Sequence, residues 1–170
     1  MIVRRIAGAA AIAGALLAGS STGDAAPTGP DAMRSLQFLV GTWNCAHTVG
    51  DFSGTYTERF ANGLGHGTWI EQTYEFPATA TEPAVQAHYY LEYDARVPRW
   101  VRFGAHDNGQ YYGMYSTTAG GSSWVWNYVL PSSRGSATWT KVSETEYRID
   151  GPSYSENGQD VTEHHDCKKL

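Results

Sequence analysis

Residues 38–45, FLVGTWNC, place a Gly-x-Trp run and a cysteine at the start of the first predicted strand. The only other cysteine is Cys167, three residues from the end of the sequence. Two cysteines in an exported chain predict one disulfide. A Cys45–Cys167 bond would tie the first strand to the last, as in a sheet that closes on itself. The alternative is a pair of buried, unpaired thiols.

From Gly41 onward, short runs rich in Thr, Tyr, Trp, Val and Phe are separated by breaks that contain Gly, Pro, Asn or Asp. Runs of this composition predict strands. A turn is expected at Asp107-Asn108-Gly109, because Asn-Gly tolerates the positive φ angles of a tight hairpin. Residues 31–38, DAMRSLQF, predict a short helix with Asp31 as its N-cap. The expected strands lie near residues 41–48, 54–61, 67–76, 85–94, 98–106, 111–117, 123–130, 135–142, 145–150 and 159–168.

The predicted strands alternate between apolar and polar residues. In residues 85–93, for example, Ala87, Tyr89 and Leu91 alternate with Gln86 and His88. Such alternation indicates one buried and one solvated face. A closed barrel removes the exposed edges that this sheet would otherwise have. The sequence therefore predicts an all-β protein, a closed antiparallel up-and-down barrel of about ten strands with a short N-terminal helix.

The first 26 residues have the composition of a secretory signal peptide. MIVRR is positively charged, IAGAAAIAGALLAG is apolar, and SSTGDAAP consists mostly of small residues. We expect cleavage after Ala25 or Ala26, a linker at residues 27–32 and a barrel domain at residues 33–170. The apolar run is shorter than the roughly 20 residues of a transmembrane helix. These features predict a secreted or periplasmic protein with no membrane span after cleavage.

Charge limits the class of partner. Removal of residues 1–26 takes away Arg4, Arg5 and Asp24, so the formal net charge falls from −5 to −6. Nucleic-acid or anionic-membrane surfaces need clustered Lys and Arg. We therefore expect no nucleic-acid partner.

The run FLVGTW, with a short helix before it and a meander after it, resembles the calycin group: lipocalins, fatty-acid-binding proteins and their bacterial relatives. The hairpin DNGQYYGMYS also suits those relatives. The resemblance spans residues 33–168 and is closest to exported lipocalin-like bacterial barrels of uncharacterised function. It implies a structural role for Gly41 and Trp43, in which the tryptophan packs across one end of the barrel.

Nitrobindin, a ten-stranded haem barrel, is a more distant resemblance. Its first strand carries Gly-x-Trp-x-Gly-x-Gly, whereas this chain has Cys45 and His47 at the two later glycine positions. Those side chains would hinder the close approach of a haem to the backbone. The late histidines His164 and His165 point to opposite faces of a strand, so at most one faces inward. We expect no cofactor.

No strong catalytic or metal motif is present, so we predict no catalytic residue and no metal site. The six histidines form no dense metal-binding pattern. His47 and His165 would nevertheless be neighbours in a closed barrel, where they could hold a metal ion or simply lie beside the disulfide. Glu71 and Glu75 share one face of a strand and are expected on the solvated side. The chain has no Gly-x-Ser-x-Gly nucleophile motif and no phosphate-binding loop. An enzyme is therefore less favoured than a binding protein.

Aromatic residues are unusually abundant, with six Trp, eleven Tyr and five Phe. Tyr and Trp combine large apolar area with a hydrogen-bonding group, which suits a cavity for a hydrophobic or amphipathic small molecule. Alternatives are that these rings form ordinary core and outer-face positions, that the barrel binds haem, or that it acts as an isomerase or cyclase. The candidate ligand-binding residues are Tyr89, Trp100, Arg102, His106, Tyr115, Trp124, Trp126, Tyr128 and Trp139.

Overall fold

The computed structural model describes residues 28–64, 68–80, 83–118, 120–130, 135–156 and 159–170, with the backbone alone described at 152–156 and 159–160. The predicted signal peptide lies outside the described residues. Within the described ranges, no helix has the length and apolar character needed to cross a bilayer.

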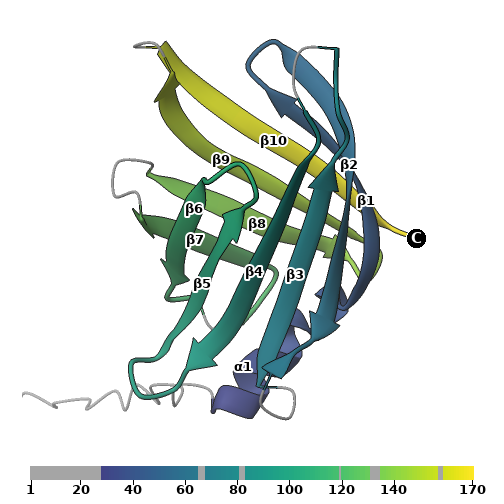
Figure 1. The fold of residues 1–170 in the computed structure, drawn as a ribbon. Coiled ribbons are helices and arrows are strands. Elements are labelled where there is room, and N and C mark those ends of the chain that lie inside the picture. Colours follow the sequence, from purple (N-terminus) through teal and green to yellow (C-terminus); the bar gives the residue numbers. More distant parts are fainter. Residues whose placement is uncertain (1–27, 65–67, 81–82, 119, 131–134, 157–158) are drawn as a thin grey trace, which may run out of the picture.

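Ten antiparallel strands form a closed up-and-down barrel (Figure 1). The order around the barrel follows the chain, with β10 returning to pair with β1. The strands are β1 (Gly41–Val49), β2 (Phe52–Asn62), β3 (Trp69–Phe76), β4 (Val85–Asp94), β5 (Arg99–His106), β6 (Tyr111–Ser116), β7 (Ser123–Leu130), β8 (Ser136–Ser143), β9 (Glu146–Glu156) and β10 (Gln159–Lys169). The predicted fold class is confirmed.

The strand bounds differ most from prediction at β9. The sequence GPSYSENG was expected to be a break after residue 150, because it is rich in Gly, Ser and Asn. In the structure β9 continues to Glu156, where it pairs with Gln159 of β10. Backbone pairing in a long hairpin therefore outweighs the low strand propensity of these residues. At the predicted 107–109 turn, Gly109 has the positive φ of 89° that such a turn requires.

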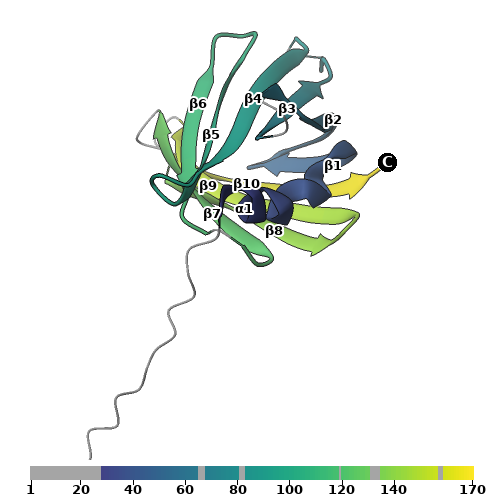
Figure 2. The same cartoon turned by 90° about the horizontal axis from the view of Figure 1, so that it is seen from below.

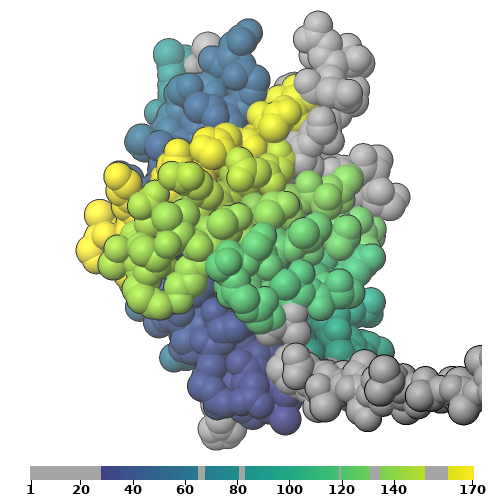
Figure 3. Space-filling model, turned by 180° about the vertical axis from the view of Figure 1, so that it is seen from behind, coloured from purple at the N-terminus to yellow at the C-terminus, as the bar shows by residue number. Residues whose placement is uncertain are grey.

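The disulfide joins the two strands that close the barrel. Cys45 of β1 lies directly opposite Cys167 of β10, and their sulfurs are bonded. Figure 3 shows β10, in yellow, lying between the blue strands of the N-terminal half and the yellow-green strands that precede β10 in the chain. The predicted pairing of the two cysteines is thus confirmed.

Helix α1 (Gly29–Leu36) and a 3-10 turn, η1 (Gln37–Leu39), lie across one end of the barrel (Figure 2). The helix begins two residues before the predicted start, with Pro30 in its first turn, a position that the fixed φ of proline suits. Asp31 was wrongly expected to be the N-cap. It lies inside the first turn, where its carboxylate accepts a hydrogen bond from the Thr28 hydroxyl.

The Gly-x-Trp run joins this helical segment to the barrel wall. Trp43 is fully buried and donates a hydrogen bond from Nε1 to the carbonyl oxygen of Leu39 at 2.6 Å. Gly41 has a φ of 139°, and a Cβ there would lie 2.6 Å from Cε of Lys169. Only glycine fits this position without strain, because of both the backbone conformation and the close approach of the lysine.

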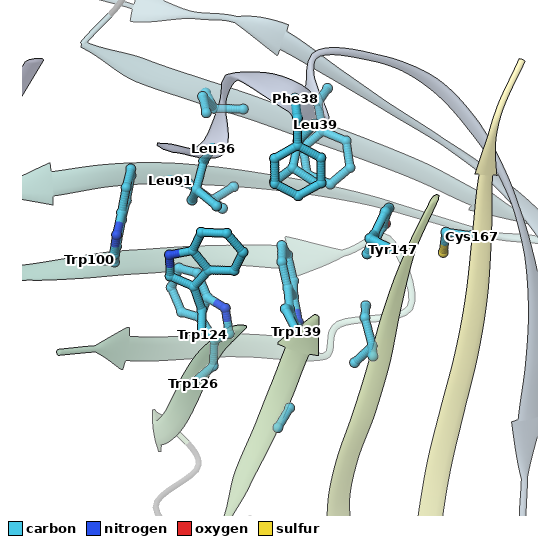
Figure 4. Close-up of a cluster of buried hydrophobic side chains, with 14 of the residues drawn as sticks. Leu36, Phe38, Leu39, Leu91, Trp100, Trp124, Trp126, Trp139, Tyr147 and Cys167 are labelled. Carbon is cyan, nitrogen blue, oxygen red and sulfur yellow. The ribbon is translucent and has the colours of Figure 1, made fainter. Parts of the chain in front are cut away.

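Large apolar side chains fill the half of the barrel next to α1. Trp100, Trp124 and Trp126 are at most 1 % exposed and pack with Leu36 and Leu39 of the helical segment (Figure 4). This half therefore has a solid core. The opposite end, where the β1–β2, β3–β4 and β5–β6 connections lie, contains open space.

Candidate functional site

The barrel end opposite α1 contains a cavity of about 840 Å³. This volume lies within the usual range for small-molecule sites. Every strand contributes to its wall, so the cavity is a product of barrel closure. Representative lining residues, one from each strand in order, are His47, Tyr56, Tyr74, Tyr89, Arg102, Tyr112, Tyr128, Trp139, Ile149 and His165.

Arg102 lies at the deep end of the cavity, where the open space meets the solid core. The even-numbered row of β5 points inward, which places Arg102 next to the buried Trp100 and leaves the Arg102 side chain only 7 % exposed. Its guanidinium carbon lies 3.7 Å from the centroid of the Tyr89 ring and 5.4 Å from that of Trp139. Cation–π contacts of this kind are strongest where water is excluded.

A glycine makes this stacking possible. A Cβ on Gly104 would lie 2.6 Å from atoms of the Tyr89 ring and 2.1 Å from the backbone oxygen of His88. The absence of a side chain therefore lets Tyr89 lie against β5, beside Arg102. On β5 the interior row therefore consists of Trp100, Arg102, Gly104 and His106.

Arg102 is connected to a buried carboxyl group by one amide. Its Nε donates to Oε1 of Gln72 at 3.0 Å, and Nε2 of Gln72 donates to Oε2 of Glu58 at 2.7 Å. Glu58 is 1 % exposed, and its Oε1 lies 3.1 Å from Sγ of Cys45 in the disulfide. Burial raises the pKa of Glu58 to about 7, although the Gln72 hydrogen bond and the Arg102 charge both act to lower it.

Tyrosine hydroxyls and a histidine cluster along one wall of the cavity. Nε2 of His106 lies 2.8 Å from the hydroxyl oxygens of both Tyr74 and Tyr89. Burial raises the pKa of Tyr74 well above its ordinary value, so this hydroxyl keeps its proton at neutral pH. The cluster offers hydrogen-bonding groups to a bound molecule. The isomerase or cyclase alternative needs an inward acid or base, either a buried carboxyl or a histidine, and His106 is one such group.

The histidines next to the disulfide also face the cavity. His47 and His165 are directly opposite each other on β1 and β10, with ring centroids 4.4 Å apart. Nδ1 of His165 lies 2.9 Å from the Tyr56 hydroxyl. Burial, together with the neighbouring His165, lowers the pKa of His47 to about 4. His47 is therefore neutral at pH 7, and its buried Nδ1 has no partner among the described residues.

The grouped metal-ligating side chains and His165 are both already engaged. Among the described residues, the grouped potential metal ligands are Cys45, Glu58 and Cys167, and both sulfurs are committed to the disulfide. A haem bound through His165 would need open space beside its Nε2. That nitrogen lies 3.7 Å from a Glu163 carboxylate oxygen, and the His47 ring lies alongside. His164 faces outward and contacts Asp150 and Asp166.

The structure separates the nine candidate ligand-binding residues into three groups. Tyr89, Arg102, His106, Tyr128 and Trp139 line the cavity. Trp100, Trp124 and Trp126 belong instead to the solid core beneath it. Tyr115 lies on the outer face of the barrel, where its ring is 5.5 Å from the Arg99 guanidinium carbon.

Sequence analysis missed several residues that line the cavity, namely Tyr56, Gln72, Tyr74 and Tyr112. It also missed Glu58, which lies beneath them. For Gln72, Tyr74 and Glu58, the alternation of inward and outward residues along each strand could have indicated an inward side chain. Gln72 and Tyr74 alternate with Glu71 and Glu75, whose expected outward orientation already implied that the even-numbered row faces inward. Glu58 shares parity with Tyr56 and Phe60 on β2. A charged residue in an apolar row is a signal of a buried, partnered group.

Comparisons with known proteins add little to this geometry. No family model matches the chain, and no curated protein is significantly similar to it. A solved structure of a redesigned β-barrel is similar with a TM-score of 0.46 and 11 % sequence identity, covering 81 % of this chain and 96 % of that one. Similarity at this level carries no functional argument.

Proposed function

We propose that this protein is a secreted or periplasmic, calycin-like carrier that binds a small hydrophobic or amphipathic molecule inside the barrel. The observation that carries the proposal is the cavity of about 840 Å³, built by all ten strands above a solid core and lined with aromatic rings. The disulfide supports an extracytoplasmic location, because thiols are kept reduced in most cytosols.

Binding would be driven by removal of the ligand's apolar surface from water. A ligand that buries roughly 300 Å² of apolar area gains about 7 kcal/mol at roughly 25 cal/mol per Å². Part of this gain offsets the loss of translational and rotational freedom. The hydroxyl of Tyr74 and the imidazole of His106 would orient the polar end of the ligand.

The test is a fluorescence titration with N-phenyl-1-naphthylamine, a neutral apolar probe whose emission rises in apolar surroundings. Wild-type protein should bind one molecule of the probe per chain. Tyr128→Ala removes a ring from the cavity wall, whereas Tyr115→Ala removes one from the outer face. Loss of about 40 Å² of buried contact at Tyr128 corresponds to about 1 kcal/mol, or about fivefold weaker binding.

The Tyr115→Ala variant should bind the probe as tightly as wild type. Absence of stoichiometric binding, or equal effects of the two substitutions, would contradict a ligand site in this cavity.

A further inference from the structure

The buried guanidinium of Arg102, at the base of the cavity, stacks on two aromatic rings but has few hydrogen-bond partners. A guanidinium carries five N–H donors. In the described part of the chain, the hydrogen bonds of Arg102 are one to the Gln72 amide and one from Nη1 to the thioether sulfur of Met114 at 3.2 Å. A thioether is a weak acceptor. No described carboxylate forms an ion pair with Arg102, although its side chain borders the cavity.

A buried charge without a direct counter-ion is costly unless something compensates it. Glu58 reaches Arg102 only through the Gln72 amide, and burial favours the neutral form of Glu58. The Tyr89 and Trp139 rings compensate part of this charge. The cavity still offers at its base a positive charge that has no direct carboxylate partner among the described residues. A ligand anion placed there would gain charge-assisted hydrogen bonds from the remaining guanidinium donors.

Glu58 and such an anion would compete for the same cation. When no ligand anion is bound to Arg102, the charge of the guanidinium favours the ionised form of Glu58. A bound anion offsets that charge, so the proton affinity of Glu58 must rise. Thermodynamic linkage then requires the reverse effect, in which protonation of Glu58 tightens the binding of the anion.

We propose that the base of the cavity is a proton-linked anion site, in which Arg102 binds the anionic group of an amphipathic ligand and Glu58 takes up a proton as it binds. The proposal rests on the carrier function proposed above and names the ligand class, an apolar body with a carboxylate-, sulfonate- or phosphate-like group. The proton comes from solvent, and no covalent bond between heavy atoms forms or breaks.

Other titratable groups surround Glu58 on the neighbouring strands. The β1 and β10 neighbours of Glu58 are the disulfide sulfurs, which do not titrate. On β2 and β3, burial raises the pKa of Tyr56 and of Tyr74, which keeps both hydroxyls protonated. On β1, the lowered pKa of His47 leaves it neutral above pH 6. On β9, the Tyr147 hydroxyl lies in the core, 4.0 Å from Sγ of Cys45. Further groups facing the cavity are Tyr89, His106, Tyr112, Tyr128, Glu163 and His165.

A pair of probes isolates the anionic group. The sulfonate 1-anilinonaphthalene-8-sulfonate has the same ring system as N-phenyl-1-naphthylamine and stays ionised between pH 6 and pH 8. We expect the sulfonate to bind more tightly than the neutral probe at pH 6. Its Kd should tighten about fivefold from pH 8 to pH 6 if the anion raises the pKa of Glu58 from about 7 by one unit. The Kd of the neutral probe should not change with pH.

Substitutions show which residues cause the pH dependence of the Kd and the preference for the sulfonate. Glu58→Gln mimics the protonated acid, so at pH 8 it should bind the sulfonate more tightly than wild type does, with no pH dependence. Arg102→Met should lose the preference for the sulfonate while it still binds the neutral probe. Arg99→Met is the matched control, because Arg99 lies on the outer face of the same strand.

The outcomes separate the two proposals. Binding of the neutral probe with no preference for the sulfonate overturns the anion site and leaves the carrier function intact. Failure of both probes to bind overturns the carrier function as well. A pH dependence that persists in Glu58→Gln assigns the proton to another group, such as a cavity histidine, and overturns the role of Glu58. Because Glu58→Gln is expected to gain affinity at pH 8, a misfolded variant cannot imitate the expected result.

Discussion

Replacement of Glu58 by glutamine should remove a specific pH dependence from the stability of the fold. In the folded protein the pKa of Glu58 is raised from 4.5 to about 7, mainly because the carboxyl group is buried. The folded state therefore holds a proton that the unfolded state has released between these two pH values. The contribution of Glu58 to the free energy of unfolding must therefore fall as the pH rises through this window and then stay constant above it.

The magnitude follows from the two pKa values. At about 1.4 kcal/mol for each pH unit, a rise from 4.5 to about 7 corresponds to about 3 kcal/mol. The variant avoids this loss, because the amide of the new glutamine stays neutral and still offers Gln72 a hydrogen-bond acceptor. The stability of Glu58→Gln relative to wild type should therefore increase by about 3 kcal/mol between roughly pH 4.5 and pH 8.

Urea unfolding followed by tryptophan fluorescence, with the disulfide intact, measures this difference. His47 has the opposite effect, since its pKa is lowered to about 4 and its stabilisation is lost as the pH falls below 6.5. The pH dependences due to Glu58 and His47 partly cancel in the wild type. The free energy of unfolding of Glu58→Gln must therefore be compared with that of the wild type at each pH. Glu75→Gln, on an exposed outer-face carboxyl, is the matched control. A stability difference between Glu58→Gln and wild type that stays constant over this range would refute the reasoning.

Two further predictions concern the closure of the barrel. Replacement of Cys45 and Cys167 together by alanine should lower the free energy of unfolding by about 4–5 kcal/mol, because the bond closes a loop with a sequence separation of 122 residues; an unchanged urea midpoint would show that the β1–β10 ladder alone closes the barrel. Gly41→Ala should destabilise by about 1–3 kcal/mol, because its φ of 139° is unfavourable for alanine and the new Cβ would meet Lys169. Gly120→Ala, where a Cβ would meet nothing within 4 Å, should leave the thermal midpoint nearly unchanged.

The fold was predictable because its determinants are local. Alternation with a period of two identifies each strand, and turn residues such as Asn108-Gly109 separate consecutive strands. Cys45 and Cys167 then link the first strand to the last, so the sequence also indicated closure. The end of β9 was missed because the pairing of Glu156 with Gln159 depends on the partner strand rather than on the composition of the segment.

The candidate site was only partly predictable, because strand alternation identifies two rows of residues but does not say how deep in the barrel each position lies. Trp126 and Tyr128 share a row on β7, yet the first belongs to the solid core and the second lines the cavity. Their difference depends on α1, which lies across one end of the barrel (Figures 1 and 2) and packs on the core there, whereas the cavity lies at the other end.

The up-and-down strand order, the closure of the barrel and the abundance of aromatic residues could all be read from the sequence. The hydrogen-bonded chain of Glu58, Gln72 and Arg102 appears only in the folded barrel, since these residues come from strands β2, β3 and β5. The physical reason is that barrel closure places inward side chains from different strands at the same height, where burial and shared hydrogen bonds, rather than sequence neighbours, set their charge.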